Sequence, residues 1–316
     1  MRVLIILGHN RLTGVNLWAK DLSGELRKKG HEVHFHISPV GDENKMGYLE
    51  GYTVFYEKVE NHIFDKKDLV DFDCYDVIIL NYNLHEILVK YVKVPIIFVS
   101  HGSMEEWYYP EYKHEYHIGI SDRTTEIVEC DETVYNGVNT SKFYPQTDIN
   151  INPKSALYLF RGQVSTTLSQ TCQNLGIELH HGSVMPNVDE MINTVDFVIG
   201  YGRSAYEGMS CGRPALIYGD NGCDGWVNEW NFKELLRGNC SGWYTQCKYD
   251  LEGLIDIIKK YDYRQGKINR RLIEEHLSLE SMGDAFERII KGVVNDYDER
   301  HDTGKVRRVK NYLSYG

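Results

Sequence analysis

The chain has 316 residues, which is long for one hydrophobic core and sufficient for two domains of about 150 residues each. Hydrophobic residues make up 42% and charged residues 26% of the sequence, which excludes a low-complexity chain. The net charge of −11 argues against a protein whose main task is to bind nucleic-acid phosphates, because that binding depends on clustered Lys and Arg.

The first half of the chain alternates short apolar runs with helix-like segments. Residues 2–7 and 32–37 are predicted strands, and residues 16–29 are a predicted helix between them. Further strands are predicted at residues 76–81, 95–100, 117–121 and 133–135. Runs such as VIIL and IIFV are apolar throughout, which is typical of strands covered on both faces. The first half is therefore predicted to be a parallel sheet flanked by helices.

A polar stretch at residues 145–154 contains two prolines and no hydrophobic periodicity, and we interpret it as an interdomain linker. The alternation then resumes, with strands predicted at residues 156–160, 177–181, 196–200 and 214–218 and helices at 164–175, 188–194, 205–211, 251–260 and 281–294. Open α/β sheets bind ligands at the carboxyl ends of their strands, so two sheets whose carboxyl ends face one another would place the site in a central cleft.

The segment at residues 198–225, VIGYGRSAYEGMSCGRPALIYGDNGCDG, is the most informative for chemistry. Its glycines, Gly202 among them, allow a tight turn after a strand, and Ser204 is expected to be the N-cap of the next helix. A helix N-terminus binds anions, and the guanidinium of Arg203 suits a diphosphate. Glu207 can accept two ribose hydroxyls. The alternative is a structural helix with an i, i+4 ion pair between Arg203 and Glu207.

This segment resembles the signature of GT-B glycosyltransferases of the family-4 type, the glycosyl transferases of group 1. In that family a Glu-Ala-Met-Ala-x-Gly-x-Pro-Val-Ile segment binds the donor nucleotide. The matching residues here are Glu207, Met209, Gly212, Pro214 and Ile217. The loop at residues 219–225, with Gly222, resembles the glycine-rich loop that closes on the donor.

Two further matches extend the resemblance over nearly the whole chain. VYNGVNTSKFYP, at residues 134–145, resembles the Asn-Gly-Val-Asp-x-x-x-Phe-x-Pro segment that ends the N-terminal domain. Residues 8–14, the following helix and the sequence GHEV at residues 30–33 resemble the first loop, helix and strand entry of the family.

The resemblance implies where the acceptor and the transferred sugar are bound. The loop at residues 8–14 and the helix after it are expected to face the acceptor, with Thr13, Gly14 and Asn16 as candidate contacts. A histidine after the strand at residues 95–100 sits near the transferred sugar in the family, which makes His101 the candidate catalytic residue.

The donor site departs from the family pattern at two positions. Arg161 stands for the arginine of an Arg…Lys pair that grips the donor phosphates, but no lysine follows it, and Arg203 is expected to take its place. The first glutamate of a Glu-x7-Glu pair normally touches the sugar hydroxyls, and Ile199 occupies that position. The expected donor-binding residues are Arg161, Gly202, Arg203, Ser204, Glu207 and Gly222.

No metal and no cofactor are expected. Asp71-Phe72-Asp73 has the letters of the Asp-x-Asp motif of metal-dependent transferases, but it precedes a strand instead of following one, and we interpret it as surface. Arg161, Arg203 and helix N-termini are expected to neutralise the leaving diphosphate.

The resemblance predicts an α/β GT-B fold, with two Rossmann-like domains whose parallel sheets face a central cleft. Residues 1–145 are the expected acceptor domain, residues 155–293 the expected donor domain and residues 294–316 a charged tail. The expected function is transfer of a hexosyl or pentosyl group from a nucleotide-diphosphate sugar, which is a substrate and not a cofactor, to an acceptor hydroxyl. Retention of configuration and independence of metal are also expected.

Two alternatives stay open beside the transferase. They are a non-catalytic GT-B-like module that binds nucleotide or glycan, and a nucleotide-sugar epimerase. A dinucleotide oxidoreductase is disfavoured, because no G-x-G-x-x-G follows either first strand. The acceptor is open among a glycan, a lipid-linked sugar and a small molecule. A nucleic-acid base stays a less favoured alternative, because the acidity of the chain counts against it and the basic tail counts for it.

A cytoplasmic location is expected. The seven cysteines have no CxxC spacing and are typical of reduced thiols, the first apolar run is too short for a signal peptide, and no apolar stretch is long enough to cross a membrane. Contact with a membrane is expected to be peripheral at most. The basic cluster in the tail, made of Lys305, Arg307, Arg308 and Lys310, is interpreted as solvated, and the alternative is contact with an anionic acceptor or a membrane surface.

Overall fold

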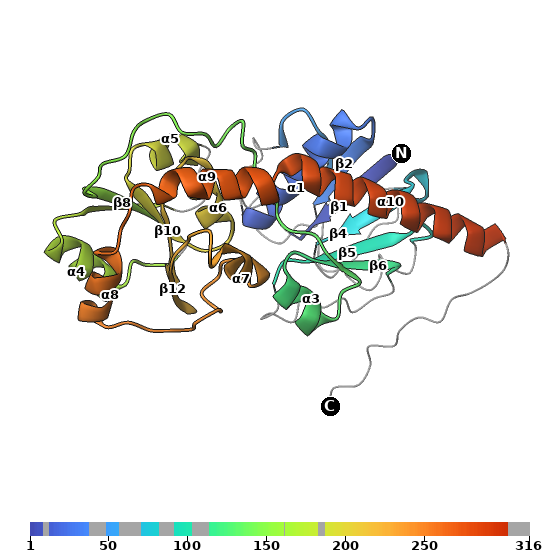
Figure 1. Cartoon of the computed structure of the whole chain (residues 1–316). Helices are drawn as coiled ribbons and strands as arrows, with labels where there is room; N and C mark the ends of the chain where they lie inside the picture. The colour runs from blue at the N-terminus through green and yellow to red at the C-terminus, as the bar shows by residue number, and fades with distance from the viewer. Residues whose placement is uncertain are drawn as a thin grey trace, which may run out of the picture. The chain divides into compact units, whose positions relative to one another are not determined.

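The structure is a computed structural model, and it describes residues 1–8, 13–37, 49–56, 71–81, 92–102, 114–160, 162–182 and 187–302. The chain forms two compact units (Figure 1). Unit 1 consists of Met1–Val134 and Met282–Gly316, and unit 2 consists of Tyr135–Ser281.

Unit 1 is built on a seven-stranded parallel sheet with the strand order β3-β2-β1-β4-β5-β6-β7. Its strands are β1 (Arg2–Leu7), β2 (Glu32–Ile37), β3 (Thr53–Tyr56), β4 (Val77–Leu80), β5 (Ile96–Ser100), β6 (Tyr116–Gly119) and β7 (Glu132–Thr133). Its helices are α1 (Gly14–Lys28), α3 (Asp122–Val128), the short 3-10 helix η2 (Phe72–Cys74) and most of α10 (Leu279–Asp302). The side chains of β4 and β5 are all buried, as expected for apolar strands in the middle of a parallel sheet.

Helix α1 begins at Gly14 and ends at Lys28, close to the predicted bounds of residues 16–29. The side chain of Thr13 accepts a hydrogen bond from the N–H of Asn16 and so caps the first turn. Trp18, Leu22 and Leu26 recur at helical spacing and are buried.

Helix α10 packs on α1 at close range. Ser278 caps it, because its Oγ accepts from the N–H of Ser281 at 3.1 Å. A Cβ atom added at Gly283 would lie 2.6 Å from Cβ of Glu25, so a side chain there would separate the two helices. The ring of Phe286 meets Trp18 edge-on, with 5.5 Å between centroids.

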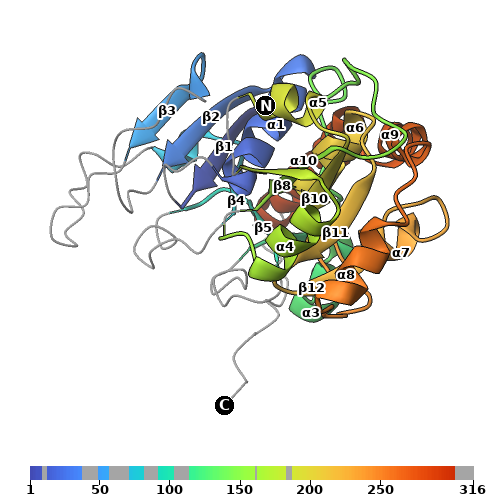
Figure 2. The ribbon, with the colours of Figure 1, turned by 90° about the vertical axis from the view of Figure 1, so that its left-hand side faces the viewer.

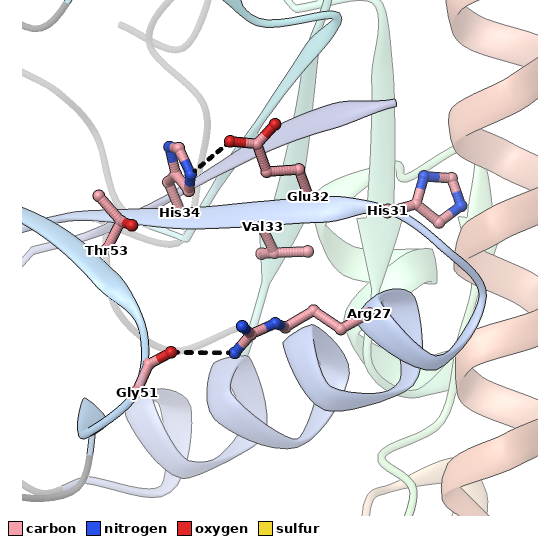
Figure 3. Close-up of a pocket in the computed structure, with 7 residues that line it drawn as sticks. All are labelled: Arg27, His31, Glu32, Val33, His34, Gly51 and Thr53. Carbon is pink, nitrogen blue, oxygen red and sulfur yellow. Dashed lines mark hydrogen bonds and ion pairs between the residues drawn. The ribbon is translucent and has the colours of Figure 1, made fainter.

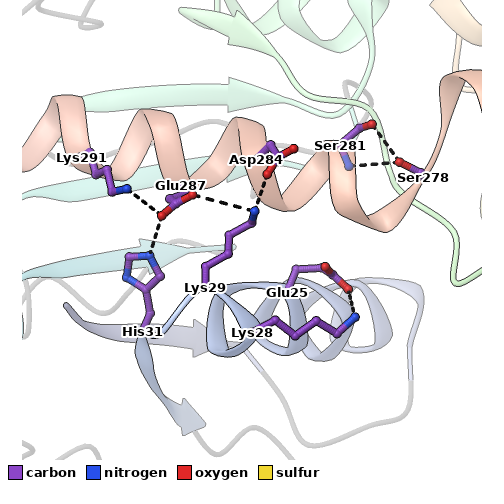
Figure 4. Close-up of polar contacts among 9 residues, drawn as sticks. All are labelled: Glu25, Lys28, Lys29, His31, Ser278, Ser281, Asp284, Glu287 and Lys291. Atoms are coloured by element: carbon purple, nitrogen blue, oxygen red, sulfur yellow. Dashed lines mark hydrogen bonds and ion pairs between the residues drawn. The ribbon is translucent and has the colours of Figure 1, made fainter.

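Charged groups line the same contact between α10 and the end of α1 (Figure 4). Lys29 pairs with Asp284 and lies 3.8 Å from Glu287. Glu287 also contacts Lys291 at 2.7 Å and His31 at 3.6 Å. The C-terminal helix is thus held on unit 1 by apolar packing and by this cluster of ion pairs.

Unit 2 is built on a five-stranded sheet with the strand order β12-β11-β10-β8-β9, in which only β12 is antiparallel to its neighbour. Its strands are β8 (Ser155–Leu159), β9 (Glu178–Gly182), β10 (Phe197–Gly200), β11 (Ala215–Gly219) and β12 (Gly222–Trp226). Its helices are α4 (Thr166–Asn174), α5 (Val188–Asn193), α6 (Arg203–Ser210), α7 (Phe232–Arg237), α8 (Leu251–Ile258) and α9 (Gln265–His276).

Helices cover both faces of the sheet of unit 2. Helices α4 and α8 pack on one face, and α6 and α9 pack on the other (Figure 2). Each face has its own hydrophobic cluster, which is the layering of a Rossmann-like α/β unit.

The bounds of the two units differ from those of the predicted domains. Residues 145–154, which the sequence suggested as a linker, belong to unit 2. The N–H of Gln146 donates to Asn193 at 2.9 Å, and the N–H groups of Asn150 and Lys154 donate to the carboxylate of Asp196 at 2.8 and 2.7 Å. Burial raises the pKa of Asp196, but these hydrogen bonds outweigh it and lower the pKa below its ordinary value.

The predicted tail also differs from what the structure describes. Helix α10 continues to Asp302, so residues 294–302 of that tail are helical. The basic cluster at Lys305, Arg307, Arg308 and Lys310 lies outside the described residues. None of the described helices is both long enough and apolar enough to cross a membrane.

Candidate functional site

The carboxyl edge of the sheet of unit 1 gathers polar residues from neighbouring strands. Asn81 follows β4, His101 follows β5, and Thr13 begins α1 after β1. Because β1, β4 and β5 are adjacent and parallel, the residues that follow them emerge at one edge.

His101 is held at this edge by a hydrogen bond and a ring contact. Its Nε2 lies 2.8 Å from Oδ1 of Asn81, and its ring meets Trp18 edge-on with 4.6 Å between centroids. The residue is half-buried. Burial lowers the pKa of His101 to about 3, so the imidazole is neutral at physiological pH. A neutral imidazole can donate and accept hydrogen bonds but is a weak base at this pKa.

The predicted acceptor contacts lie at the start of α1. Thr13 caps the helix, and Asn16 is fully buried. A Cβ atom added at Gly14 would meet no other atom within 4 Å, so the backbone is open there. Residues 9–12 of the predicted loop lie outside the described residues. Contact of these three residues with an acceptor stays a prediction.

In unit 2 the turn from β10 into α6 is only two residues long, Tyr201 and Gly202. Gly202 is the N-cap, with a φ of 49° that favours glycine, and a Cβ atom added there would lie 3.0 Å from Nδ2 of Asn239. The prediction that Ser204 is the N-cap is therefore wrong. Ser204 lies in the first turn, with its N–H bonded to the carbonyl of Tyr201 at 3.1 Å.

Arg203 and Glu207 are brought together on α6. Nε of Arg203 lies 2.6 Å from Oε1 of Glu207, and their side chains are 16% and 8% exposed. The ion pair of the structural alternative is therefore present. It is compatible with a ribose contact, because a carboxylate has about four acceptor positions. Arg161, the other predicted phosphate ligand, lies outside the described residues.

The position of the missing glutamate of the family pair lies in a strand of unit 2. Ile199, which occupies its position, lies inside β10 and is fully buried. In this chain the side chain at that position is therefore part of the core of unit 2.

The predicted glycine-rich loop forms a β-hairpin from β11 and β12. The hydroxyl of Tyr201 donates to the carbonyl of Gly222 at 2.7 Å and accepts from its N–H at 3.0 Å. Cβ atoms added at Gly219 and Gly242 would lie 2.7 and 2.6 Å from the Tyr201 side chain. Tyr201 thus holds the hairpin and the loop after α7 against the turn that precedes α6. The sequence had no local signal for this role, since Gly219, Gly222 and Gly242 are all distant from Tyr201 in the chain.

The triplet Asp71-Phe72-Asp73, which has the letters of an Asp-x-Asp motif, lies at the start of η2. Oδ1 of Asp71 accepts from the N–H of Asp73 at 3.2 Å, and Asp73 pairs with Lys93 at 3.3 Å. Asp71 and Asp73 are exposed, which confirms the surface interpretation. Within the described ranges no group of three or more His, Cys, Asp or Glu side chains is arranged to hold a metal ion.

A surface cavity of about 310 Å³ lies at the opposite edge of the sheet of unit 1, beside the first residues of β2 and β3 (Figure 3). It is lined by Arg27, His31, Glu32, Val33, His34, Gly51 and Thr53. Arg27 donates to the carbonyl of Gly51 at 3.2 Å, and His34 contacts Glu32 at 3.0 Å. Open parallel sheets bind ligands at the carboxyl ends of their strands, so this cavity is not the expected substrate site.

Neither a protein-family model nor a curated protein sequence matches the chain. Solved structures do match it. Sucrose-phosphate synthase from Thermosynechococcus elongatus has a TM-score of 0.62 and 12% identity, over 93% of this chain and 99% of that chain. HepE from Anabaena, solved with UDP and glucose, has a TM-score of 0.60 and 12% identity, over 92% of this chain and 99% of that chain.

A third similar structure is an α-glucosyltransferase solved with UDP and a 13-mer DNA that contains a HMU base. Its TM-score is 0.53 at 12% identity, over 92% of this chain and 99% of that chain. At such low identity the likeness concerns the fold. Each comparison covers nearly the whole chain, which confirms the predicted α/β fold with two Rossmann-like units. The cleft expected between the units stays a prediction. The chain therefore has the GT-B fold of these glycosyltransferases.

Proposed function

We propose that the chain is a glycosyltransferase that moves a sugar from a nucleotide-diphosphate sugar to an acceptor hydroxyl. The observation that carries this proposal is the start of α6, where a glycine-capped helix N-terminus lies beside the paired side chains of Arg203 and Glu207. The GT-B fold supports it, and so does UDP in the structures of HepE and the α-glucosyltransferase, which makes a UDP-sugar the first donor to test.

Each group at the start of α6 has a chemical role in the proposed donor site. The N–H groups of the helix N-terminus and the guanidinium of Arg203 bind the diphosphate, and Glu207 accepts the ribose hydroxyls. Arg161 is proposed as a second phosphate ligand. These positive groups stabilise the charge that develops on the leaving diphosphate, so that the transfer needs no metal ion.

We further propose that the transfer retains the anomeric configuration. The acceptor oxygen bonds to the anomeric carbon, the bond from that carbon to the phosphate oxygen breaks, and the acceptor proton passes to an oxygen of the leaving diphosphate. His101, whose pKa is about 3, is too weak a base to take that proton, so its role is to orient a substrate. A glycan, lipid-linked or small-molecule acceptor suits a chain with a net charge of −11 better than a nucleic acid does.

Thermal unfolding in the presence of UDP, GDP, ADP and their sugars tests the donor site. A ligand at about 100 times its Kd stabilises the folded state by about 2.7 kcal/mol. We expect this stabilisation in the wild-type protein and its loss in Glu207→Gln. Glu274→Gln is the matched control, because Glu274 makes the same i, i+4 contact to Arg270 at 2.6 Å on α9. Unchanged donor affinity in Glu207→Gln contradicts the assignment of this site.

The nucleotide-sugar that binds is then incubated with candidate acceptors, and the release of nucleoside diphosphate is measured. Release that depends on an acceptor supports a transferase. Binding without release on any acceptor favours the non-catalytic module, and conversion of the sugar without release indicates an epimerase.

A further inference from the structure

The amide of Asn81 has a fixed orientation. Asn81 is fully buried, and its Nδ2 lies 3.2 Å from the carbonyl oxygen of Ile6 in β1. A carbonyl oxygen only accepts hydrogen bonds, so the atom that faces it must be the NH2 group of the amide. The amide oxygen, Oδ1, therefore points to the other partner, His101.

This orientation decides which ring nitrogen of His101 carries the proton. Oδ1 of Asn81 is an acceptor and lies 2.8 Å from Nε2 of His101, so Nε2 must donate. In a neutral imidazole the other nitrogen, Nδ1, then carries a lone pair and is an acceptor.

The ring of His101 also packs against an aromatic side chain. Trp18 lies edge-on to the His101 ring, and Phe286 of α10 packs edge-on against Trp18 in turn. Among the described residues none hydrogen-bonds Nδ1 of His101, and the residue keeps part of its surface exposed.

We propose that Asn81 is a positioning residue that keeps His101 in the Nε2–H tautomer, so that Nδ1 accepts a hydrogen bond from a hydroxyl of the sugar or of the acceptor. An acceptor nitrogen is unsuited to a phosphate oxygen, which is itself an acceptor, and this separates the role of His101 from that of Arg203. The identity of the hydroxyl donor rests on the proposed function, whereas the tautomer rests only on contacts within unit 1.

The tautomer is measured by two-bond proton–nitrogen correlation spectra of the full chain labelled with 15N in histidine. The His101 signals are assigned by their loss in His101→Asn. We expect a protonated Nε2 and an unprotonated Nδ1 in the wild-type protein. In Asn81→Leu the acceptor is absent, so the 15N chemical shifts of both ring nitrogens move toward the average of the two tautomers. His34 is the internal reference in every spectrum.

Kinetics then separate positioning from a merely structural effect. We expect Asn81→Leu to lower kcat/KM about three- to tenfold, the size of one neutral hydrogen bond, with unchanged stabilisation by the nucleotide alone.

Two results overturn the inference. They are a wild-type His101 with its proton on Nδ1, and an Asn81→Leu spectrum identical to that of the wild-type protein. A wild-type protein that transfers no sugar from any donor contradicts the proposed function alone, since the spectra decide the tautomer without turnover.

Discussion

Two histidines of unit 1 are held without charge at neutral pH. Burial lowers the pKa of His101 to about 3, and burial together with the nearby His114 lowers the pKa of His117 to about 3. His117 is 1% exposed, and its Nε2 shares a hydrogen bond of 2.8 Å with Oγ of Ser100. His101 follows β5 and His117 lies in β6, and neither imidazole has a carboxylate partner among these contacts.

These lowered pKa values predict a pH-dependent stability. In the unfolded chain histidine titrates near about 6.5, so between about pH 3 and pH 6.5 the unfolded state binds more protons than the folded state. The free energy of unfolding therefore rises with pH across this window and levels off above it. Urea denaturation at several pH values measures the slope, which we expect to be smaller in His117→Gln, where one of the two protons is absent. An equal slope in this variant contradicts the low pKa of His117.

Residue chemistry at the site was only partly predictable from the sequence. The pairing of Arg203 with Glu207 followed from their i, i+4 spacing, because that geometry is local. The capping position at Gly202 did not, since Asn239, which approaches this glycine closely, comes from a distant loop. Arg213 is 1% exposed and donates to backbone carbonyls of α5, a structural role that its place between Gly212 and Pro214 did not indicate.

At the scale of elements, α6 packs closely on β10 because Gly208 has no side chain. A Cβ atom added at Gly208 would lie 2.1 Å from Cγ2 of Val198, closer than any side chain tolerates without movement. The helix that carries Arg203 and Glu207 is thereby placed directly against the strand that precedes it. The glycine lowers helix propensity, and the close packing compensates for it.

Gly208→Ala tests this packing, because helix propensity predicts a higher free energy of unfolding and the close approach of α6 to β10 predicts a lower one. Propensity alone would stabilise the chain by about 1 kcal/mol, whereas overpacking against Val198 costs about 1–3 kcal/mol, and we expect net destabilisation in urea. Gly292→Ala on α10 is the control. A Cβ atom there meets nothing within 4 Å, so we expect the higher helix propensity of alanine to stabilise this variant. Val198→Ala makes room for the new Cβ atom, so the double variant should lose less stability than the sum of the two single variants. Strictly additive changes in the free energy of unfolding would contradict the contact.

The elements themselves were predictable to different degrees. Buried strands such as β1, β4, β8 and β10 followed from apolar runs, because a strand covered on both faces excludes polar residues. Strand β12, with the sequence GCDGW, was not predicted. Glycine and aspartate are poor strand formers, and its pairing with β11 depends on tertiary contacts. Helix α9 was missed because Gly266 and its many charged residues obscure the apolar spacing of Leu272 and Ile273.

At the scale of the molecule, the chain leaves unit 1 and returns to it. Unit 2 is one continuous segment, whereas unit 1 is completed by α10, nearly 150 residues after Val134. No local pattern could predict this return, because the apolar stripe of α10 would suit either unit. The predicted boundary at residue 293 placed the helix in the donor domain, and the contacts of Phe286 with Trp18 and of Gly283 with Glu25 place most of it in unit 1.

Two cores in one chain predict two separable unfolding events. Phe286 and Phe232 are each fully buried, the first in unit 1 and the second in unit 2. Replacement of either by Ala removes a buried ring and costs about 3–5 kcal/mol, and each is the matched control of the other. Hydrogen exchange followed by mass spectrometry at rising urea resolves peptides of the two units. We expect Phe286→Ala to lower the urea midpoint of unit 1, with that of α10, and Phe232→Ala to lower that of unit 2. Equal shifts of both units in either variant would show that the chain unfolds as one cooperative body, against the assignment of α10 to unit 1 alone.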